Sequence, residues 1–192
     1  MSRVHAVHLE SVPPKPWRNG GGTQRDLLAL PTPQDWRVRI SVAEIGADGR
    51  FSSYPDIVRW FVVCEGEGVL LTFPRGEHRV TRASAPLRFD GAQAPACTLL
   101  AGKVRALNLM LRNVHGGIAT AADHRPWSPP AGACGLYAAV DGVCHAEARR
   151  DRVPARTLIW YDSPPPVLRF AADADPGEAV GWWLQWSTRS SA

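Results

Sequence analysis

The stretch Trp36-Arg37-Val38-Arg39-Ile40-Ser41-Val42-Ala43-Glu44-Ile45 decides the fold class. Its side chains fall into two alternating sets, one formed by Trp36, Val38, Ile40 and Val42 and the other by Arg37, Arg39, Ser41 and Ala43. A period of 2 places the two sets on opposite faces of an extended strand. The stretch therefore predicts a β-strand with two arginines on one face, although periodicity alone does not tell which face is inside.

Short apolar runs separated by Gly, Pro, Asp and Asn continue in both directions from this strand, whereas continuous helical periods are hard to find. Further strands are expected at residues 58–63, 69–73, 97–101, 104–111, 135–140, 143–146, 157–161, 167–170 and 180–186. Gly102-Lys103 and Asp141-Gly142 are typical of tight hairpin turns. We predict an all-β protein.

A proline-rich segment, His124-Arg125-Pro126-Trp127-Ser128-Pro129-Pro130, separates the two sets of expected strands. Prolines suit a crossing segment better than the interior of a strand. With 192 residues the chain is too short for two ordinary independent domains. We expect one unit made of two β halves, residues 1–122 and 123–192, built as paired barrels or sandwiches.

The charge pattern argues against a nucleic-acid partner. The chain has 22 Lys and Arg against 18 Asp and Glu, a formal net charge of +4. All basic residues except Lys15 and Lys103 are arginines, and they are dispersed from Arg3 to Arg189. Such a distribution does not form the basic stripe that DNA or RNA binding requires.

Neither export nor a membrane span is indicated. The first residues lack an apolar stretch of signal-peptide length, and no run of about 18 apolar residues occurs. Cys64, Cys97, Cys134 and Cys144 are far apart and form no C-x-x-C pair. We expect a cytoplasmic protein with reduced, mostly buried thiols.

The most unusual local sequence is Trp17-Arg18-Asn19-Gly20-Gly21-Gly22-Thr23. Three successive glycines allow positive φ and can aim several backbone N–H groups into one concavity that favours an anion. The alternative is an ordinary glycine turn. The nucleotide phosphate-loop pattern G-x-x-x-x-G-K-[ST] is missing here.

Arg39 and Ser41 share one strand face, and Arg59 precedes the apolar run Trp60-Phe61-Val62-Val63. A guanidinium inside a barrel needs a partner or a charged ligand, because a buried charge is costly. A carboxylate ligand would supply that partner. The alternative is an arginine on the solvent face of an edge strand.

The sequence gives little support for a metal site or for a hydrolase. No H-x-H or H-x-x-x-H pattern arises on an expected strand, so we predict no metal and no cofactor. No G-x-S-x-G elbow is present either. A histidine paired with a carboxylate from a distant position stays open as an acid/base pair.

Several motifs in order resemble the HutD/Ves family. They are Trp17 to Thr23, then Arg39-Ile40-Ser41-Val42-Ala43, then Gly49-Arg50-Phe51-Ser52 with Arg59, then Glu65-Gly66, and finally Asn108-Leu109-Met110. Two positions depart from the family pattern. The family tryptophan falls on Val38, with Trp36 two residues earlier, and Ala106 replaces the acidic residue of Asp-x-Asn.

The resemblance implies a metal-free cupin-like fold (an RmlC-like jelly roll) with two β-barrel halves in one chain, a bicupin, and an association with bacterial histidine utilisation. It also implies a ligand site. The residues expected there are Trp17, Asn19, Gly20, Gly21, Gly22, Thr23, Arg39, Ser41, Arg59 and Asn108.

Our leading hypothesis is a protein that binds a small carboxylate, with urocanate and N-formylglutamate as candidates, and so modulates a catabolic pathway. A non-enzymatic role is favoured over a metal-independent isomerase, epimerase or hydrolase that uses a histidine and a carboxylate. A third hypothesis is a protein-interaction module that works through exposed sheet edges or through Trp182, Trp183 and Trp186. A homodimer stays open.

Overall fold

The computed structural model describes residues 3–17, 20–163, 165–174 and 179–187. The chain divides into two units, one formed by residues 12–113 and the other by residues 1–11 together with 114–192. This division differs from the expected halves 1–122 and 123–192. The strand β1 (Val4–His8) pairs along its whole length with β17 (Thr157–Tyr161), so the first residues belong with the last third of the chain.

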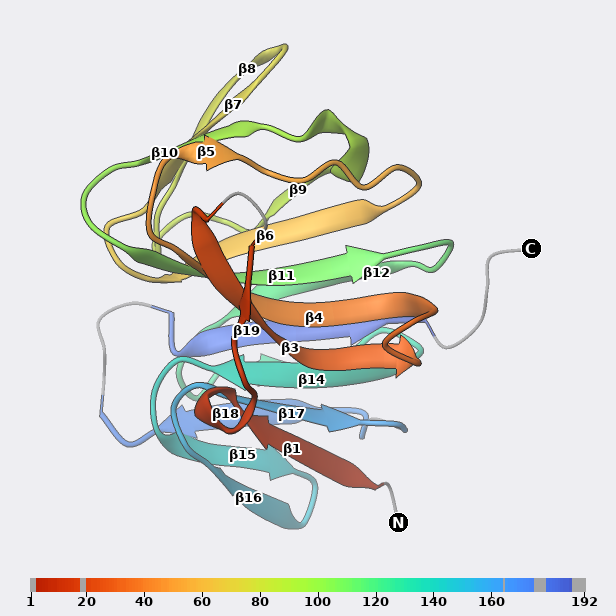
Figure 1. Ribbon diagram of the computed structural model, residues 1–192. Helices are drawn as coiled ribbons and strands as arrows, with labels where there is room; N and C mark the ends of the chain where they lie inside the picture. The colour runs from red at the N-terminus through yellow and green to blue at the C-terminus, as the bar shows by residue number, and fades with distance from the viewer. Residues whose placement is uncertain (1–2, 18–19, 164, 175–178, 188–192) are drawn as a thin grey trace. The chain divides into compact units, whose positions relative to one another are not determined.

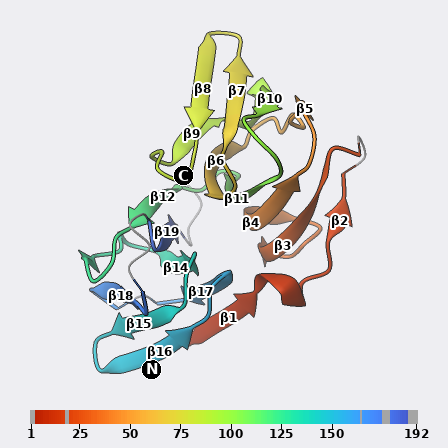
Figure 2. The ribbon, with the colours of Figure 1, turned by 90° about the vertical axis from the view of Figure 1, so that its left-hand side faces the viewer.

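The unit of residues 12–113 contains two antiparallel sheets. The larger has the order β2 (Lys15–Pro16), β3 (Gly22–Pro31), β4 (Trp36–Ile45), β11 (Val104–Leu111), β6 (Val58–Glu65) and β9 (Leu87–Asp90). The smaller has the order β5 (Gly49–Arg50), β10 (Ala96–Leu99), β7 (Val69–Phe73) and β8 (Gly76–Val80). A short 3-10 helix, η2 (Gly91–Gln93), connects β9 to β10. Figure 2 shows the full length of the β7–β8 hairpin, which belongs to the smaller sheet.

The core of this unit explains the alternation in β4. Ala43 and Ile45 belong to an apolar cluster that also includes Phe61, Val63 and Leu71, residues of both sheets. Because Arg39 and Ser41 occupy the same face of β4 as Ala43 and Ile45, they point to the interior side of the sheet. The opposite face is also buried, at Val38, Ile40 and Val42.

The second unit is likewise built from two antiparallel sheets. One has the order β1, β17, β14 (Ala133–Ala138), β19 (Gly181–Trp186) and β12 (Gly116–Ala121). The other has the order β13 (Pro126–Trp127), β18 (Leu168–Ala172), β15 (Gly142–Ala146) and β16 (Arg149–Val153). The 3-10 helix η1 (Leu9–Ser11) follows β1. The prediction of an all-β protein is confirmed (Figure 1).

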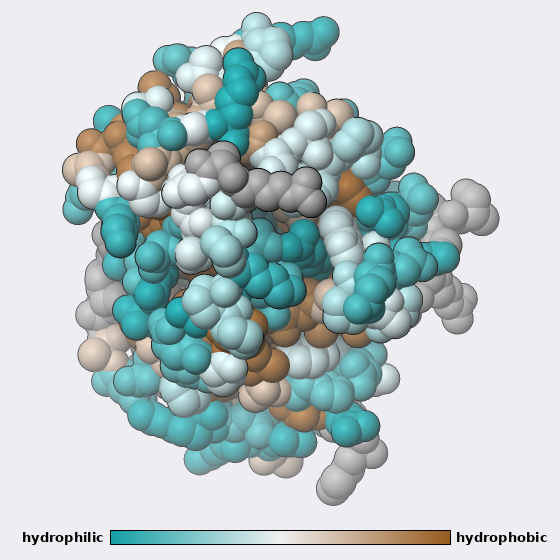
Figure 3. All heavy atoms as spheres, viewed as in Figure 1, coloured by the Kyte–Doolittle hydropathy of each residue, from teal (hydrophilic) through white to brown (hydrophobic). Residues whose placement is uncertain are grey.

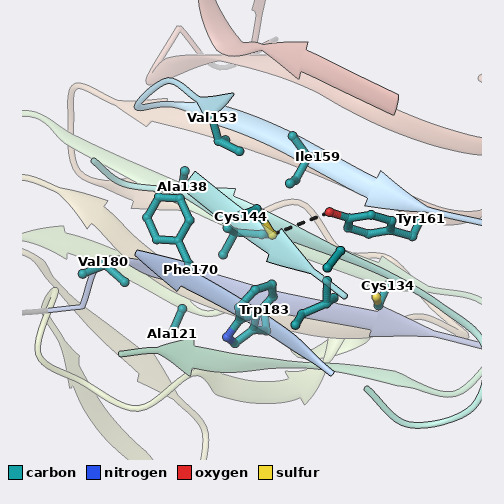
Figure 4. Packing of buried hydrophobic residues seen from close by; sticks show 13 residues of the cluster. Ala121, Cys134, Ala138, Cys144, Val153, Ile159, Tyr161, Phe170, Val180 and Trp183 are labelled. Carbon is teal, nitrogen blue, oxygen red and sulfur yellow. Dashed lines mark hydrogen bonds between the residues drawn. The ribbon is translucent and has the colours of Figure 1, made fainter. Parts of the chain in front are cut away.

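Figure 4 shows that the core of this second unit is filled by side chains. Phe170, Val180 and Trp183 pack together there, and the Tyr161 hydroxyl donates to Cys144 Sγ over 3.6 Å. Trp183 also stacks on Trp127, with ring centroids 4.9 Å apart. Burial raises the pKa of the Cys144 thiol to about 11.

The turns expected to be hairpins instead join different sheets. Gly102-Lys103 leads from β10 in the smaller sheet to β11 in the larger one, and Asp141-Gly142 leads from β14 to β15 in the same manner. Some consecutive strands of this fold lie in different sheets, so a tight turn can close a corner between sheets as well as a hairpin. The hairpin interpretation was wrong at both places.

All four cysteines are free and buried. The three tryptophans near the end of the chain, Trp182, Trp183 and Trp186, are at most 2% exposed, so they offer no surface patch to a partner. On the face shown in Figure 3, hydrophilic residues surround scattered apolar ones. No helix among the described residues is long and apolar enough to cross a membrane.

Candidate functional site

A cavity of about 470 Å³ opens in the unit of residues 12–113. Its walls come from β2, β3, β5, β6, β11 and the loop after β5. The lining residues are Lys15, Pro16, Trp17, Gln24, Arg50, Phe51, Ser52, Ser53, Tyr54, Arg59 and Met110. The charged side chains among them are three cations and no carboxylate, so the cavity favours an anionic ligand.

The loop of residues 51–57 forms one wall and is held in place by the segment around η2. The N–H groups of Phe51 and Tyr54 donate to the carbonyls of Pro95 and Gly91 over 3.0 and 2.8 Å. Gly91 has no room for a side chain, since a Cβ there would lie 2.6 Å from the Tyr54 carbonyl oxygen. These contacts fix aromatic and hydroxyl groups on the cavity wall.

Arg59 is the buried charge of the cavity, only 6% exposed. Its Nε and Nη2 donate to Asn108 Oδ1 over 2.9 and 2.7 Å, and its guanidinium lies 4.4 Å from the Phe51 ring centroid and 5.5 Å from that of Phe89. Among the residues that the structure describes, no carboxylate forms an ion pair with it. Burial lowers the pKa of Arg59 to about 10; the nearby Tyr54 opposes this shift and Arg39 adds to it.

Arg39 lies on the same interior face, but its charge is already paired. Its Nε and Nη2 donate to Asp26 Oδ1 over 2.9 and 2.8 Å. The same carboxylate accepts from Lys15 Nζ over 3.0 Å and from Gln24 Nε2 over 2.9 Å. Of the two arginines expected to meet a carboxylate ligand, Arg59 lines the cavity, whereas Arg39 is neutralised by Asp26 and does not line it.

The glycine run forms the turn between β2 and β3. The Gly20 N–H donates to the Trp17 carbonyl over 3.1 Å, and the Trp17 N–H donates to the Gly22 carbonyl over 2.9 Å. A Cβ at Gly22 would lie 2.2 Å from the Glu44 carbonyl oxygen and 3.2 Å from the Trp17 ring. The glycines thus seat Trp17 at the cavity, and neither they nor Thr23 line it. Asn19 falls outside the described residues.

Asn108 and Ser41 are both buried and do not line the cavity. In the sheet register, Asp26, Ser41 and Asn108 are neighbours on β3, β4 and β11. Asn108 Nδ2 donates to the Ala106 carbonyl over 3.3 Å, so both ends of this buried amide are engaged. Asn108 therefore positions Arg59.

Sequence reasoning did not assign several lining residues, namely Lys15, Gln24, Arg50, Phe51, Ser52, Ser53, Tyr54 and Met110. A signal existed for some of them. Arg50, Phe51, Ser52 and Met110 stand inside the motifs that carry the family resemblance, although those motifs were not used as site residues. Lys15 and Gln24 carried no comparable signal, because their position depends on the pairing of β2 with β3.

None of the six histidines lines the cavity. The pair of His5 Nε2 and Asp162 Oδ2, 2.9 Å apart, lies on β1 and next to β17 in the other unit. The acid/base hypothesis thus finds no histidine at this cavity. Within the described ranges no three His, Cys, Asp or Glu side chains could share a metal ion. The interior face of the large sheet carries the guanidinium groups of Arg39 and Arg59, and cationic groups do not fit a metal site.

Residues 9–157 match the model of the HutD protein family. "Protein Ves" from Citrobacter koseri is 30% identical over 106 residues, which is 54% of this chain and 56% of that protein. An "uncharacterized 21.2 kDa protein in hutC 3'region" from Pseudomonas putida is 28% identical over 112 residues, 57% of this chain and 59% of that protein. The chain thus spans little more than half the length of these curated relatives.

Solved structures share the fold over nearly the whole chain. A conserved protein of unknown function from Pseudomonas aeruginosa PAO1 has a TM-score of 0.83 at 21% identity, covering 99% of this chain and 100% of that one. HutD from Pseudomonas fluorescens SBW25 has a TM-score of 0.83 at 18% identity, covering 98% and 100%. Oxalate decarboxylase from Lactobacillus farciminis has a TM-score of 0.62 at 8% identity, covering 97% and 87%. At these identities the likeness shows a cupin-like fold.

Proposed function

The chain belongs to the HutD family, and from this premise we propose that it binds a small carboxylate metabolite and thereby modulates histidine utilisation. The observation that carries the proposal is Arg59, a buried guanidinium that lines a cavity and has no described carboxylate partner. The relative from the hutC region supports the pathway.

Arg59 offers a carboxylate one defined approach. Asn108 occupies the side of the guanidinium formed by Nε and Nη2, and the rings of Phe51 and Phe89 lie near its carbon Cζ. The Nη1 end is left for a ligand oxygen. A carboxylate bound there would supply the counter-charge that a buried guanidinium lacks.

The remaining lining favours an acid with a planar or polar body. Trp17, Phe51 and Tyr54 supply aromatic surface, and Ser52 and Ser53 supply hydroxyl groups. Arg50 adds positive charge that would suit a second carboxylate, whereas Lys15 is already paired with Asp26. The volume of about 470 Å³ admits a molecule of the size of urocanate or N-formylglutamate.

The proposal is tested by calorimetric titration with urocanate, N-formylglutamate and the neutral amide of each acid. We expect the acids to bind and the amides to bind at least about tenfold more weakly, since a charge-assisted hydrogen bond is lost. Arg59→Met should weaken acid binding at least about tenfold as well. Arg79→Met, which removes an exposed arginine from β8, is the matched control.

Arg59→Met leaves the Asn108 amide oxygen buried without its donor, so a folding defect has to be separated from a binding defect. The double variant Arg59→Met/Asn108→Leu replaces both partners by apolar groups and should fold. Absence of binding by every acid at millimolar concentration, or acid binding by the folded double variant equal to that of the native protein, would show that the proposal is wrong.

A further inference from the structure

In the unit formed by residues 1–11 and 114–192, the outer face of the sheet β13-β18-β15-β16 carries a row of basic side chains. Register pairs His145 of β15 with Arg150 of β16 on one side and with Arg169 of β18 on the other. Their neighbours Cys144 and Phe170 belong to the core, so these three side chains point away from it. Arg150 and Arg169 are exposed and His145 is half-buried. We call Arg150, His145 and Arg169 the cationic row.

The cationic row has no carboxylate partner among the described residues. Two other arginines nearby do have carboxylate partners. Arg149 donates to Asp151 over 2.8 Å, and Arg152 donates to Asp173 over 2.7 Å. Arg150 and Arg169 make no ion pair in the described ranges. Adjacent strands are about 4.8 Å apart, so the two arginine charges lie within about 10 Å of each other, with the titratable His145 between them. Such an arrangement favours a negatively charged partner.

The row lies next to an open sheet edge. Strand β16 pairs with β15 on one side only and ends the order of its sheet (Figures 1 and 2). The surface over β16, in the lower part of Figure 3, is hydrophilic. An edge strand presents backbone N–H and C=O groups that an extended peptide can pair with.

We propose that β16 and the cationic row form a docking surface for an extended acidic peptide segment of a partner protein, which adds as a strand to the edge of β16. Acidic side chains at alternate positions of that segment would share the face of the sheet with Arg150. This inference concerns a different unit from the carboxylate cavity and does not depend on it.

A peptide fits this surface better than a nucleic acid. Nucleic-acid binding rests on many phosphate contacts, whereas the row offers two arginines and a histidine. An edge strand pairs with the backbone of a peptide, and a nucleic acid has no equivalent group.

The titration of His145 supports the same reading. Its pKa is lowered, first by partial desolvation and then by Arg169, Arg150 and His124, which are the charged groups that face it. A bound carboxylate would raise that pKa. By linkage, an acidic segment should bind more tightly as the pH falls through the titration range of His145.

The test uses a fluorescein-labelled peptide of alternating Glu and Val and measures its fluorescence anisotropy with the full chain. We expect binding that weakens at high salt, that weakens at least about fivefold in Arg150→Glu, and that weakens less in Arg169→Glu, because β18 lies two strands further from the edge. Arg79→Glu makes the same charge change on β8, an edge strand of the unit of residues 12–113, and should leave the affinity unchanged. Hydrogen exchange should slow at the amides of β16 when the peptide binds.

Three further probes distinguish the docking of an acidic strand from other modes of binding. A peptide with Lys in place of Glu should not bind, and a Glu peptide with N-methylated backbone should bind much more weakly. An oligonucleotide of equal charge should not compete. Equal binding of the N-methylated peptide, competition by the oligonucleotide, or an unchanged affinity in Arg150→Glu would each overturn the proposal.

Discussion

Arg59 and Arg39 show how two arginines on one interior face acquire different roles. Asp26 neutralises Arg39 at 2.8 Å, whereas Arg59 is held by the neutral oxygen of Asn108 at 2.7 Å and keeps an uncompensated charge. Since a neutral amide orients a guanidinium without cancelling its charge, Asn108 preserves the attraction of Arg59 for an anion. The positive charge of the cavity therefore depends on Asn108 being an amide and not a carboxylate.

That difference gives a prediction for Asn108→Asp. The new carboxylate would accept the same two N–H groups and neutralise Arg59, so the chain should fold while its affinity for the acid falls at least about tenfold. Calorimetric titration measures the affinity, and Gln93→Glu, an amide-to-acid change at an exposed position, is the control. An affinity in Asn108→Asp equal to that of the native protein would contradict the role assigned to Asn108.

The site could be predicted from sequence only in part, and the reason lies in sheet register. The sequence points to Arg39, Arg59 and Asn108, but of these only Arg59 lines the cavity, and the pairing of Arg39 with Asp26 was not foreseen. Asp26 lies opposite Ser41, so its carboxylate reaches Arg39, two residues along β4 on the same face, and the local sequence does not announce this register. Which arginine stays available for a ligand is thus decided by a neighbouring strand.

At the scale of elements, strands rich in buried apolar residues were predicted, whereas the edge strands and the inner strand β3 were missed. Residues 36–45, 69–73, 104–111 and 157–161 match strands of the structure at both ends. β8 and β16 are polar along nearly their whole length and lie at sheet edges, so they lack the alternation that burial imposes. The turn signals marked chain reversals correctly but could not tell a hairpin from a corner between sheets.

The turn between β2 and β3 yields an element-scale prediction. Gly22→Ala would drive a Cβ into the Glu44 carbonyl and the Trp17 ring, so it should lower the free energy of unfolding by about 1–3 kcal/mol and weaken acid binding. Gly46→Ala meets nothing closer than 3.9 Å and should change stability by less than about 0.5 kcal/mol. Urea unfolding compares the two variants, and equal stabilities would refute the packing argument.

At the scale of the whole molecule, each unit has its own two sheets and its own core. The carboxylate cavity is lined by residues between Lys15 and Met110, all in one unit. The core of the other unit is closely filled, and no residue of that unit lines the cavity. The proposed carboxylate site therefore belongs to one unit alone.

Phe170→Ala tests this separation. Loss of a fully buried phenylalanine should cost about 3–5 kcal/mol in the stability of its own unit, seen as faster amide exchange in residues 114–174. The affinity of the folded protein for the acid should stay within about twofold of the native value. Phe61→Ala, at a fully buried position of the other unit, should lower both stability and acid affinity. Equal losses of affinity in the two variants would contradict a cavity confined to one unit.

The pairing of β1 with β17 has a consequence for biosynthesis. Residues 12–113 are contiguous, so this unit can fold on the ribosome as soon as it emerges. Strand β1 leaves the ribosome earlier still, yet it must wait without a partner until residues 157–161 have been translated. Strand β1 is thus incorporated late, after the unit of residues 12–113 can already have folded, and its own unit closes only when two segments about 150 residues apart in sequence meet.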